Sequence, residues 1–217
     1  MITISRAVEI VLNHKPFILD ALNDEIINYS SLASFIKSDI EKVLKREVKS
    51  GAIVMAIRRL GDLRRVNFTK KLNQQIKKFG DILVRSNLVD YTFKNSDSLM
   101  QNQQKLLELI KNRSSFFYTV TQGVYETTFI LSNEINDEIA AIFAGEKLVS
   151  KSWGLSSITI KLPVGNTEQP GLYYYIFKKL AWEGINILEV VSTSNEVTVL
   201  LKDKDIDRAF SVVKGLK

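Results

Sequence analysis

Residues 156–216 read SSITIKLPVGNTEQPGLYYYIFKKLAWEGINILEVVSTSNEVTVLLKDKDIDRAFSVVKGL, and this stretch decides the fold. Apolar and polar residues alternate at 158–162, which predicts a strand that Pro163 ends. Pro170-Gly171 then opens a helix, which ends at Gly184. The residues on its buried face recur every four positions, at Leu172, Ile176 and Leu180. Two strands follow at 187–194 and 196–202, and Asp203 or Asp205 begins a last helix.

The preceding stretch, residues 81–153, repeats this order. Alternation at 82–84 and 89–93 predicts strand, and a helix opens at Ser98 with the Ser-x-x-Gln spacing of a capping box. Two strands at 115–122 and 124–132, a helix from Asn136 and a strand at 147–153 complete a β-α-β-β-α-β order. Corresponding helices recur after about 70 residues, which predicts two ferredoxin-like units in tandem.

The second unit shows no fourth strand after its last helix. We expect either that residues 147–153 are shared between the units or that a second chain completes the sheet, and we therefore expect a dimer.

The first 80 residues predict short helices. Helical spacing begins at Val8, and Pro16 sits where a second helix can start. Cap-forming residues at 28–31 and at Ser38-Asp39 predict a helix of about two turns followed by a separate one to Val48. Ser50-Gly51 interrupts before a further helix at 52–60. This pattern, INYSSLASFIKSDIEKVLKREVKSGAIVMAIRRL, resembles a helix-turn-helix domain of the winged type.

Two features of this region stay open. The wing is not evident, because residues 62–80 look like a basic linker helix. The recognition helix is either 39–49 or 48–60.

The positive charge lies in this helical region. The whole chain carries a formal charge of +6, but residues 1–80 hold 15 Lys and Arg against 8 Asp and Glu, and residues 36–78 alone carry +9. Such a field recruits polyanions, although a basic face of a domain that pairs with another protein would look the same. The residues that we assign to DNA contacts are Lys49, Ser50, Arg58, Arg59, Arg64, Arg65, Lys70 and Lys71.

The composition argues against an enzyme. The chain has no cysteine and one histidine, His14, which excludes disulfides, thiolate nucleophiles and Cys/His zinc sites. Neither a phosphate-cradling loop nor a metalloprotease motif is present, so we expect no cofactor, no metal and no catalytic residues. The N-terminus has no signal-peptide core, and no long apolar run predicts a membrane span; we expect a cytoplasmic protein.

The C-terminal stretch resembles an ACT domain, most of all the last ACT domain of aspartate kinases. The match rests on Pro170-Gly171-Leu172, Ile176-Phe177, the run 183–187 and Ser192-Thr193-Ser194. The stretch 81–153 resembles a degenerate partner, with Asp97-Ser98 in place of the Pro-Gly step. A helix-turn-helix followed by paired ACT domains is similar to an archaeal group of predicted regulators of amino acid metabolism.

The resemblance implies a fold and an effector site. The implied class is α+β, with a helical domain at 1–65, a linker helix at 66–80, a degenerate ACT-like domain at 81–154 and an ACT domain at 155–217. ACT domains typically bind amino acids where the first strand meets the first helix, and a helix N-terminus suits a carboxylate. The implied effector-binding residues are Asn166, Glu168, Gln169, Pro170, Gly171, Leu172, Asn186 and Ile187, with Glu168 as acceptor for the α-ammonium group.

Two functions remain open at this point. The first is an amino-acid-responsive regulator that couples effector binding by the ACT domains to DNA binding by the helical domain. The alternative is a regulatory subunit without DNA contact that docks on an amino-acid biosynthetic enzyme such as aspartate kinase. In both, the partners are an amino acid and a second copy of the chain through its ACT domains, with no membrane.

Overall fold

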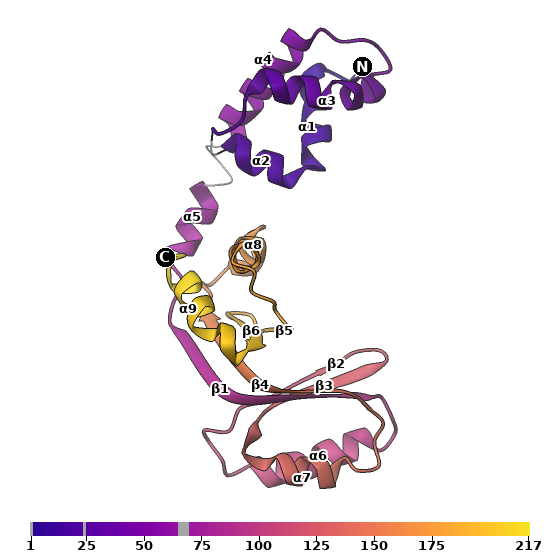
Figure 1. Cartoon of the computed structure of the whole chain (residues 1–217), viewed down its shortest axis with the longest axis vertical. Helices are drawn as coiled ribbons and strands as arrows, with labels where there is room; N and C mark the ends of the chain where they lie inside the picture. Colours follow the sequence, from indigo (N-terminus) through magenta and orange to yellow (C-terminus); the bar gives the residue numbers. More distant parts are fainter. Residues whose placement is uncertain (1, 24, 65–69) are drawn as a thin grey trace. The chain divides into compact units, whose positions relative to one another are not determined.

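The computed structural model describes residues 2–23, 25–64 and 70–217 and divides the chain into two compact units, one up to Gln74 and the other from Gln75. We call them the helical unit and the α+β unit (Figure 1). The helices of the first part of the chain are α1 (Ile4–Asn13), α2 (Pro16–Asn23), α3 (Tyr29–Leu44), α4 (Ser50–Arg64) and α5 (Lys70–Ile76).

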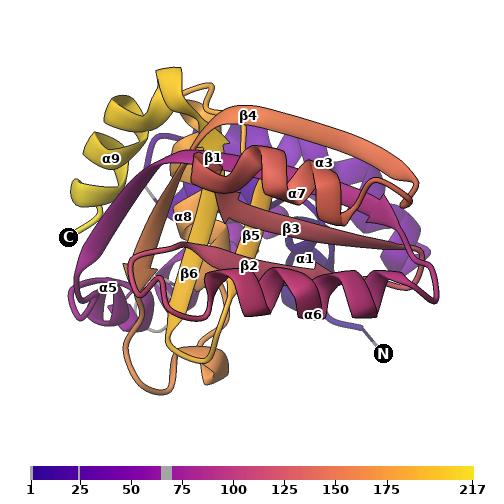
Figure 2. The ribbon, with the colours of Figure 1, turned by 90° about the horizontal axis from the view of Figure 1, so that it is seen from below.

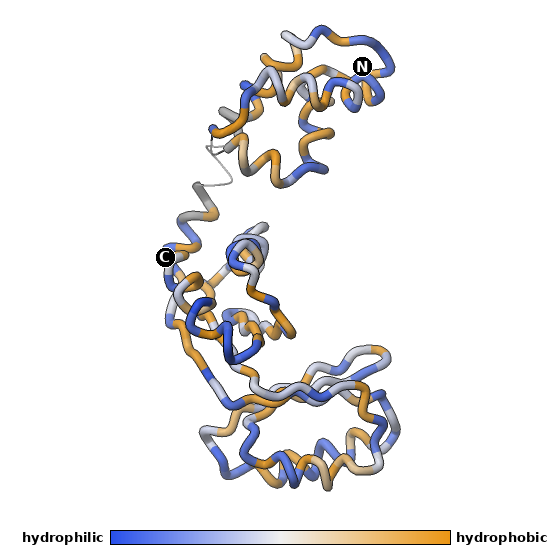
Figure 3. The backbone as a smooth tube through the Cα atoms, viewed as in Figure 1, coloured by the Kyte–Doolittle hydropathy of each residue, from blue (hydrophilic) through white to orange (hydrophobic). Residues whose placement is uncertain are grey.

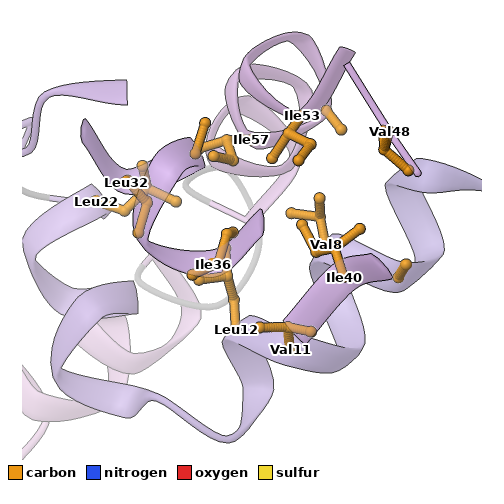
Figure 4. Close-up of a cluster of buried hydrophobic side chains, with 13 residues drawn as sticks. Val8, Val11, Leu12, Leu22, Leu32, Ile36, Ile40, Val48, Ile53 and Ile57 are labelled. Atoms are coloured by element: carbon orange, nitrogen blue, oxygen red, sulfur yellow. The ribbon is translucent and has the colours of Figure 1, made fainter. Parts of the chain in front are cut away.

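A single apolar core holds the helical unit together. The buried side chains come from α1, α3 and α4, with Leu22 of α2 and Val48 of the α3–α4 connection added (Figure 4). Apolar and polar stretches alternate along these helices (Figure 3), because each helix buries one face only. The buried members are Ala7, Val8, Val11, Leu12, Leu22, Leu32, Ala33, Ile36, Ile40, Val48, Ile53, Ala56 and Ile57.

One predicted helix break is wrong. The cap at Asn28 is confirmed, since its side chain accepts hydrogen bonds from the main-chain N–H groups of Ser30 and Ser31. The helix does not stop at Ser38-Asp39, however, and α3 runs on to Leu44. The apolar stripe of α3 continues through this point, and Asp39 faces outward, where it pairs with Lys15 and Lys42 at 3.6 and 3.7 Å.

The connection between α3 and α4 is short and fixed at both ends. Lys45 adopts the left-handed conformation that ends α3, and the main-chain N–H of Val48 donates to the carboxylate of Glu41 at 3.0 Å. The predicted interruption at Ser50-Gly51 is the first turn of α4. No strand occurs among residues 2–23, 25–64 and 70–74, so the winged form of the domain stays a prediction.

The α+β unit is built on one antiparallel sheet with the strand order β2-β3-β1-β4-β6-β5. Its strands are β1 (Ile82–Lys94), β2 (Tyr118–Gln122), β3 (Glu126–Ser132), β4 (Leu148–Lys161), β5 (Glu189–Ser192) and β6 (Glu196–Lys202). Its helices are α6 (Leu99–Ile110), α7 (Asn136–Ile142), α8 (Leu172–Trp182) and α9 (Ile206–Lys214). The structure thus confirms an α+β architecture with an antiparallel sheet.

Two long central strands serve both halves of this sheet. The second half of β1 pairs with β3, and its first half pairs with the end of β4, as in Ile82 opposite Ile160. The end of β4 in turn pairs with β6. Each half therefore has four strands, and no second chain is needed to complete either one. The expected boundary between residues 154 and 155 falls inside β4.

The two halves bury separate cores. Val89, Tyr91 and Phe93 of β1 pack in one core with residues of α6 and α7. Figure 2 shows both helices lying over the same face of this part of the sheet. In the other half, most residues at the end of β4 and in β6 are buried, together with Leu172, Ile176 and Leu180 of α8. A smaller cluster of Leu88, Ile130, Leu155 and Leu200 joins the halves.

Candidate functional site

The predicted effector loop connects β4 to α8. It spans residues 162–171 and contains two glycines with positive φ, Gly165 at 79° and Gly171 at 90°. Gly171 is the residue directly before α8, and Leu172 turns inward with 2% of its surface exposed. Glycine has no side chain, so Gly171 makes no capping hydrogen bond to the first turn of α8.

Asn166 is a structural element of this loop. It is buried, and its side-chain amide donates to the carbonyl of Pro163 at 3.0 Å and to that of Ser194 at 2.6 Å. The main chain is tied to the same turn, because the N–H of Leu162 donates to the carbonyl of Asn195 at 2.7 Å. The turn between β5 and β6 therefore belongs to the loop's environment, which sequence patterns gave no means to detect.

The other predicted loop residues lie on the surface. Glu168 and Pro170 are exposed, and Gln169 is half-buried with its amide donating to the carbonyl of Pro170 at 3.3 Å. Glu168 thus has a solvent-facing carboxylate two residues before the turn that starts α8.

Asn186 and Ile187 lie away from this loop. They follow the C-terminal end of α8 and precede β5, whereas the loop is tied to the opposite end of β5 through Ser194. An 11-residue helix is about 16 Å long, so α8 separates the two groups along its axis. Within one chain the structure brings together residues 166–172 and leaves 186 and 187 outside this group.

The candidate DNA-contacting residues centre on α4. Lys49, Ser50, Arg58 and Arg59 are all exposed, while Ile53, Ala56 and Ile57 face the core. The guanidinium group of Arg58 lies 5.7 Å from the ring centre of Tyr29, which orients it.

The other predicted DNA-contacting residues follow later in the chain. Arg64 lies in the last turn of α4, and Lys70 and Lys71 lie in α5. Arg65 lies outside the described residues.

One buried carboxylate stands out in the α+β unit. Asp90 of β1 is 7% exposed, and burial, with Glu189 nearby, raises its pKa to about 6 against the weaker opposing effects of Thr92 and Lys202. Burial likewise raises the pKa of Glu189.

Among the residues that the structure describes, no three metal-binding side chains lie close enough together to hold a metal ion. No helix in this part of the chain has the length and apolar content needed to cross a membrane.

Known proteins resemble the chain in structure only. No protein-family profile matches it, and no curated protein matches its sequence. A crystal structure of aspartokinase alpha and beta subunits is 16% identical with a TM-score of 0.51, over 63% of this chain and 97% of that one. What is shared is the fold. The α+β unit has the antiparallel architecture of the regulatory, ACT-type domains of aspartate kinase.

Two further structures of aspartate kinases show the same likeness in fold. The ligand-free regulatory subunit of aspartate kinase from Thermus thermophilus is 13% identical with a TM-score of 0.51, over 62% of this chain and 95% of that one. Aspartate kinase from Clostridium acetobutylicum is 16% identical with the same TM-score, but only 34% of its length is covered. The likeness therefore concerns the regulatory portion of such enzymes.

Proposed function

We propose that this protein is an amino-acid-responsive regulator whose α+β unit binds a small amino acid at the N-terminus of α8. The observation that supports this most directly is Gly171, which has a φ of 90° and opens α8 within a fold shared with aspartate kinase regulatory domains. The helix start offers main-chain N–H donors and a partial positive charge to a carboxylate. Glu168 is the nearby acceptor for an α-ammonium group.

A binding screen tests the effector site. Calorimetry or thermal shift against the twenty amino acids should find at least one that stabilises the protein. The variant Gly171→Val should lose this response, because a branched side chain disfavours the positive φ and fills the approach to the helix start. Gly145→Ala is the matched control, since an added Cβ there meets nothing within 4 Å. A chain that responds to no amino acid would contradict the proposal.

The helical unit supplies the output in this proposal, as a DNA-binding domain of the helix-turn-helix type at residues 1–65 with a linker helix to residue 80. The support is the exposed basic face of α4 beside a core formed by α1, α3 and α4. Arginine and lysine on such a face neutralise phosphates and position a protein on the duplex. An effector couples to DNA binding only if it binds the competent and incompetent states with different affinity.

Fluorescence anisotropy with genomic DNA fragments tests the output. Binding should weaken steeply as salt rises, because each neutralised phosphate releases counterions. If the protein does not bind DNA even at low salt, the proposal that the helical unit is a DNA-binding domain is wrong. The amino acid identified in the screen should shift the affinity in either direction.

A second candidate function is a regulatory subunit that docks on an amino-acid biosynthetic enzyme, through a dimer of the α+β unit. The regulatory subunit from Thermus thermophilus favours it, because 95% of that separate chain is matched by this one. Mixing the purified protein with aspartate kinase of the same organism, with and without DNA, separates the two candidates. A stable complex that excludes DNA supports the second, and light scattering gives the oligomeric state.

A further inference from the structure

The first half of the sheet repeats the arrangement around α8. The side-chain amide of Asn95 donates to the carbonyl of Gly123 in the β2–β3 turn at 2.9 Å, as that of Asn166 donates to Ser194 in the β5–β6 turn. In both halves, the loop that enters the first helix is therefore tied to the following hairpin. The start of α6 is the counterpart of the start of α8.

A carboxylate already lies beside the start of α6. Glu146, from the connection between α7 and β4, accepts hydrogen bonds from the hydroxyl of Ser96 at 2.6 Å, the hydroxyl of Ser98 at 2.8 Å and the amide of Asn102 at 2.7 Å. Lys105 donates to the Asn102 oxygen at 3.0 Å, which aims the amide nitrogen at Glu146. Asn102 is itself buried, with 9% of its surface exposed.

The donors match a charged carboxylate and not its neutral acid. Burial acts to raise the pKa of Glu146, but the hydrogen bonds from Ser96, Ser98 and Asn102 outweigh it and hold that pKa below its usual value. Ser98 directs its hydroxyl to Glu146 and makes no cap bond to the helix. Ser96 also accepts a hydrogen bond from the main-chain N–H of Leu99 at 3.2 Å. Both serine hydroxyls donate to the carboxylate of Glu146, which lies 50 and 48 positions further along the chain.

We infer that the start of α6 is a carboxylate cradle that Glu146 fills from within the chain, so that the first ACT-like half is closed to free amino acids. Resting on the function proposed above, this leaves one effector site per chain, at α8. There, the N-cap residue is Gly171 where the first half has Ser98, and a glycine carries no hydroxyl to hold an internal carboxylate. In this inference, the first half has Asp97-Ser98 in place of a Pro-Gly step because Ser98 holds the carboxylate of Glu146.

Chemical rescue tests the cradle without reference to any effector. Glu146→Ala should lower the melting temperature by about 3 °C through the loss of charge-assisted hydrogen bonds. Acetate should restore most of this loss in a concentration-dependent manner, compared with chloride at equal ionic strength. Wild type and Glu138→Ala, which removes an exposed carboxylate on α7, report any acetate effect elsewhere in the protein, including the start of α8, and should gain much less than Glu146→Ala.

Other outcomes would overturn the inference. These are a Glu146→Ala variant as stable as wild type, or an acetate effect of equal size in all three proteins. If that variant yields no folded protein, carbon-13 NMR of Glu146 decides the matter: its pKa should rise in Ser98→Ala, and an unchanged value refutes the cradle.

Calorimetry then gives the stoichiometry. One effector per chain is expected in wild type, and two would refute the closed site. If no amino acid binds wild type at all, the proposed function fails, while acetate rescue of Glu146→Ala still decides the cradle.

Discussion

The side-chain amide of Asn166 and the main-chain carbonyl of Ser194 are joined by a hydrogen bond of 2.6 Å that spans 28 residues of sequence. Through it, the loop that enters α8 is held against the turn between β5 and β6. The same amide group also donates to Pro163, so a buried side chain closes the loop on itself and on the sheet.

Replacing Asn166 should therefore destabilise the α+β unit. Asn166→Ala removes both hydrogen bonds that this buried side chain donates, to the carbonyl groups of Pro163 and Ser194, and we expect a loss of about 1–2 kcal/mol. Both tryptophans of the chain, Trp153 and Trp182, lie in the α+β unit, so tryptophan fluorescence during urea unfolding reports on this unit alone. Asn186→Ala, at an exposed asparagine, is the control and should unfold at the same urea concentration as wild type.

Asn166 also shows where sequence reasoning was limited. The order of strands and helices, the start of α8 and its buried face followed from local sequence patterns, because each depends on neighbouring residues. The role of Asn166 depends on a carbonyl group 28 positions away, and an asparagine in a loop looks the same whether it binds a ligand or a backbone. Glu146 was missed for the same reason.

The two central strands were predicted in pieces for a different physical reason. β1 pairs with β4 through register shifts between Arg85 and Leu88 and again between Leu88 and Asp90. Asn87 in β1 and Gly154 in β4 have positive φ, so each strand is distorted where it passes from one core to the other. The alternation of apolar residues changes phase at such a point, and one long strand then resembles two short ones.

Gly171→Ala should cost stability even without a ligand. A residue with a Cβ at a φ of 90° is strained, and we expect a loss of about 1 kcal/mol for the α+β unit. Thermal or urea unfolding measures it, and Gly145→Ala should be close to neutral. Equal stability of Gly171→Ala and wild type would show that this turn relaxes to negative φ.

Asp90 makes the stability of the α+β unit depend on pH. Its pKa rises from 3.8 to about 6 on folding, so the folded state binds the proton more tightly than the unfolded state does. This contribution is fully present below pH 4 and is lost as the pH rises through 6. Asp90→Asn should therefore be more stable than wild type at pH 8 by about 1 kcal/mol, a value reduced by solvent screening.

The pH profile of this difference is the decisive measurement. Urea unfolding at intervals from pH 4 to pH 8 should show the advantage of Asp90→Asn shrinking towards zero at the acid end. Asp81→Asn, at an exposed position just before β1, should follow the wild-type profile throughout. An advantage of equal size at pH 4 and pH 8 would assign it to packing instead of ionisation.

Arg59 gives a quantitative test of DNA binding by α4. It is exposed on the face opposite the buried Ile53 and Ile57, where it can reach a phosphate without disturbing the core. Arg59→Gln should make the slope of log association constant against log salt concentration less steep by about 0.9, the value for one phosphate contact. Arg208→Gln removes the same charge from α9, where Arg208 pairs with Asp205 at 3.0 Å, and should leave the slope unchanged. If both variants change the slope equally, the salt dependence of DNA binding reflects the overall charge of the protein, and α4 is not the contact surface.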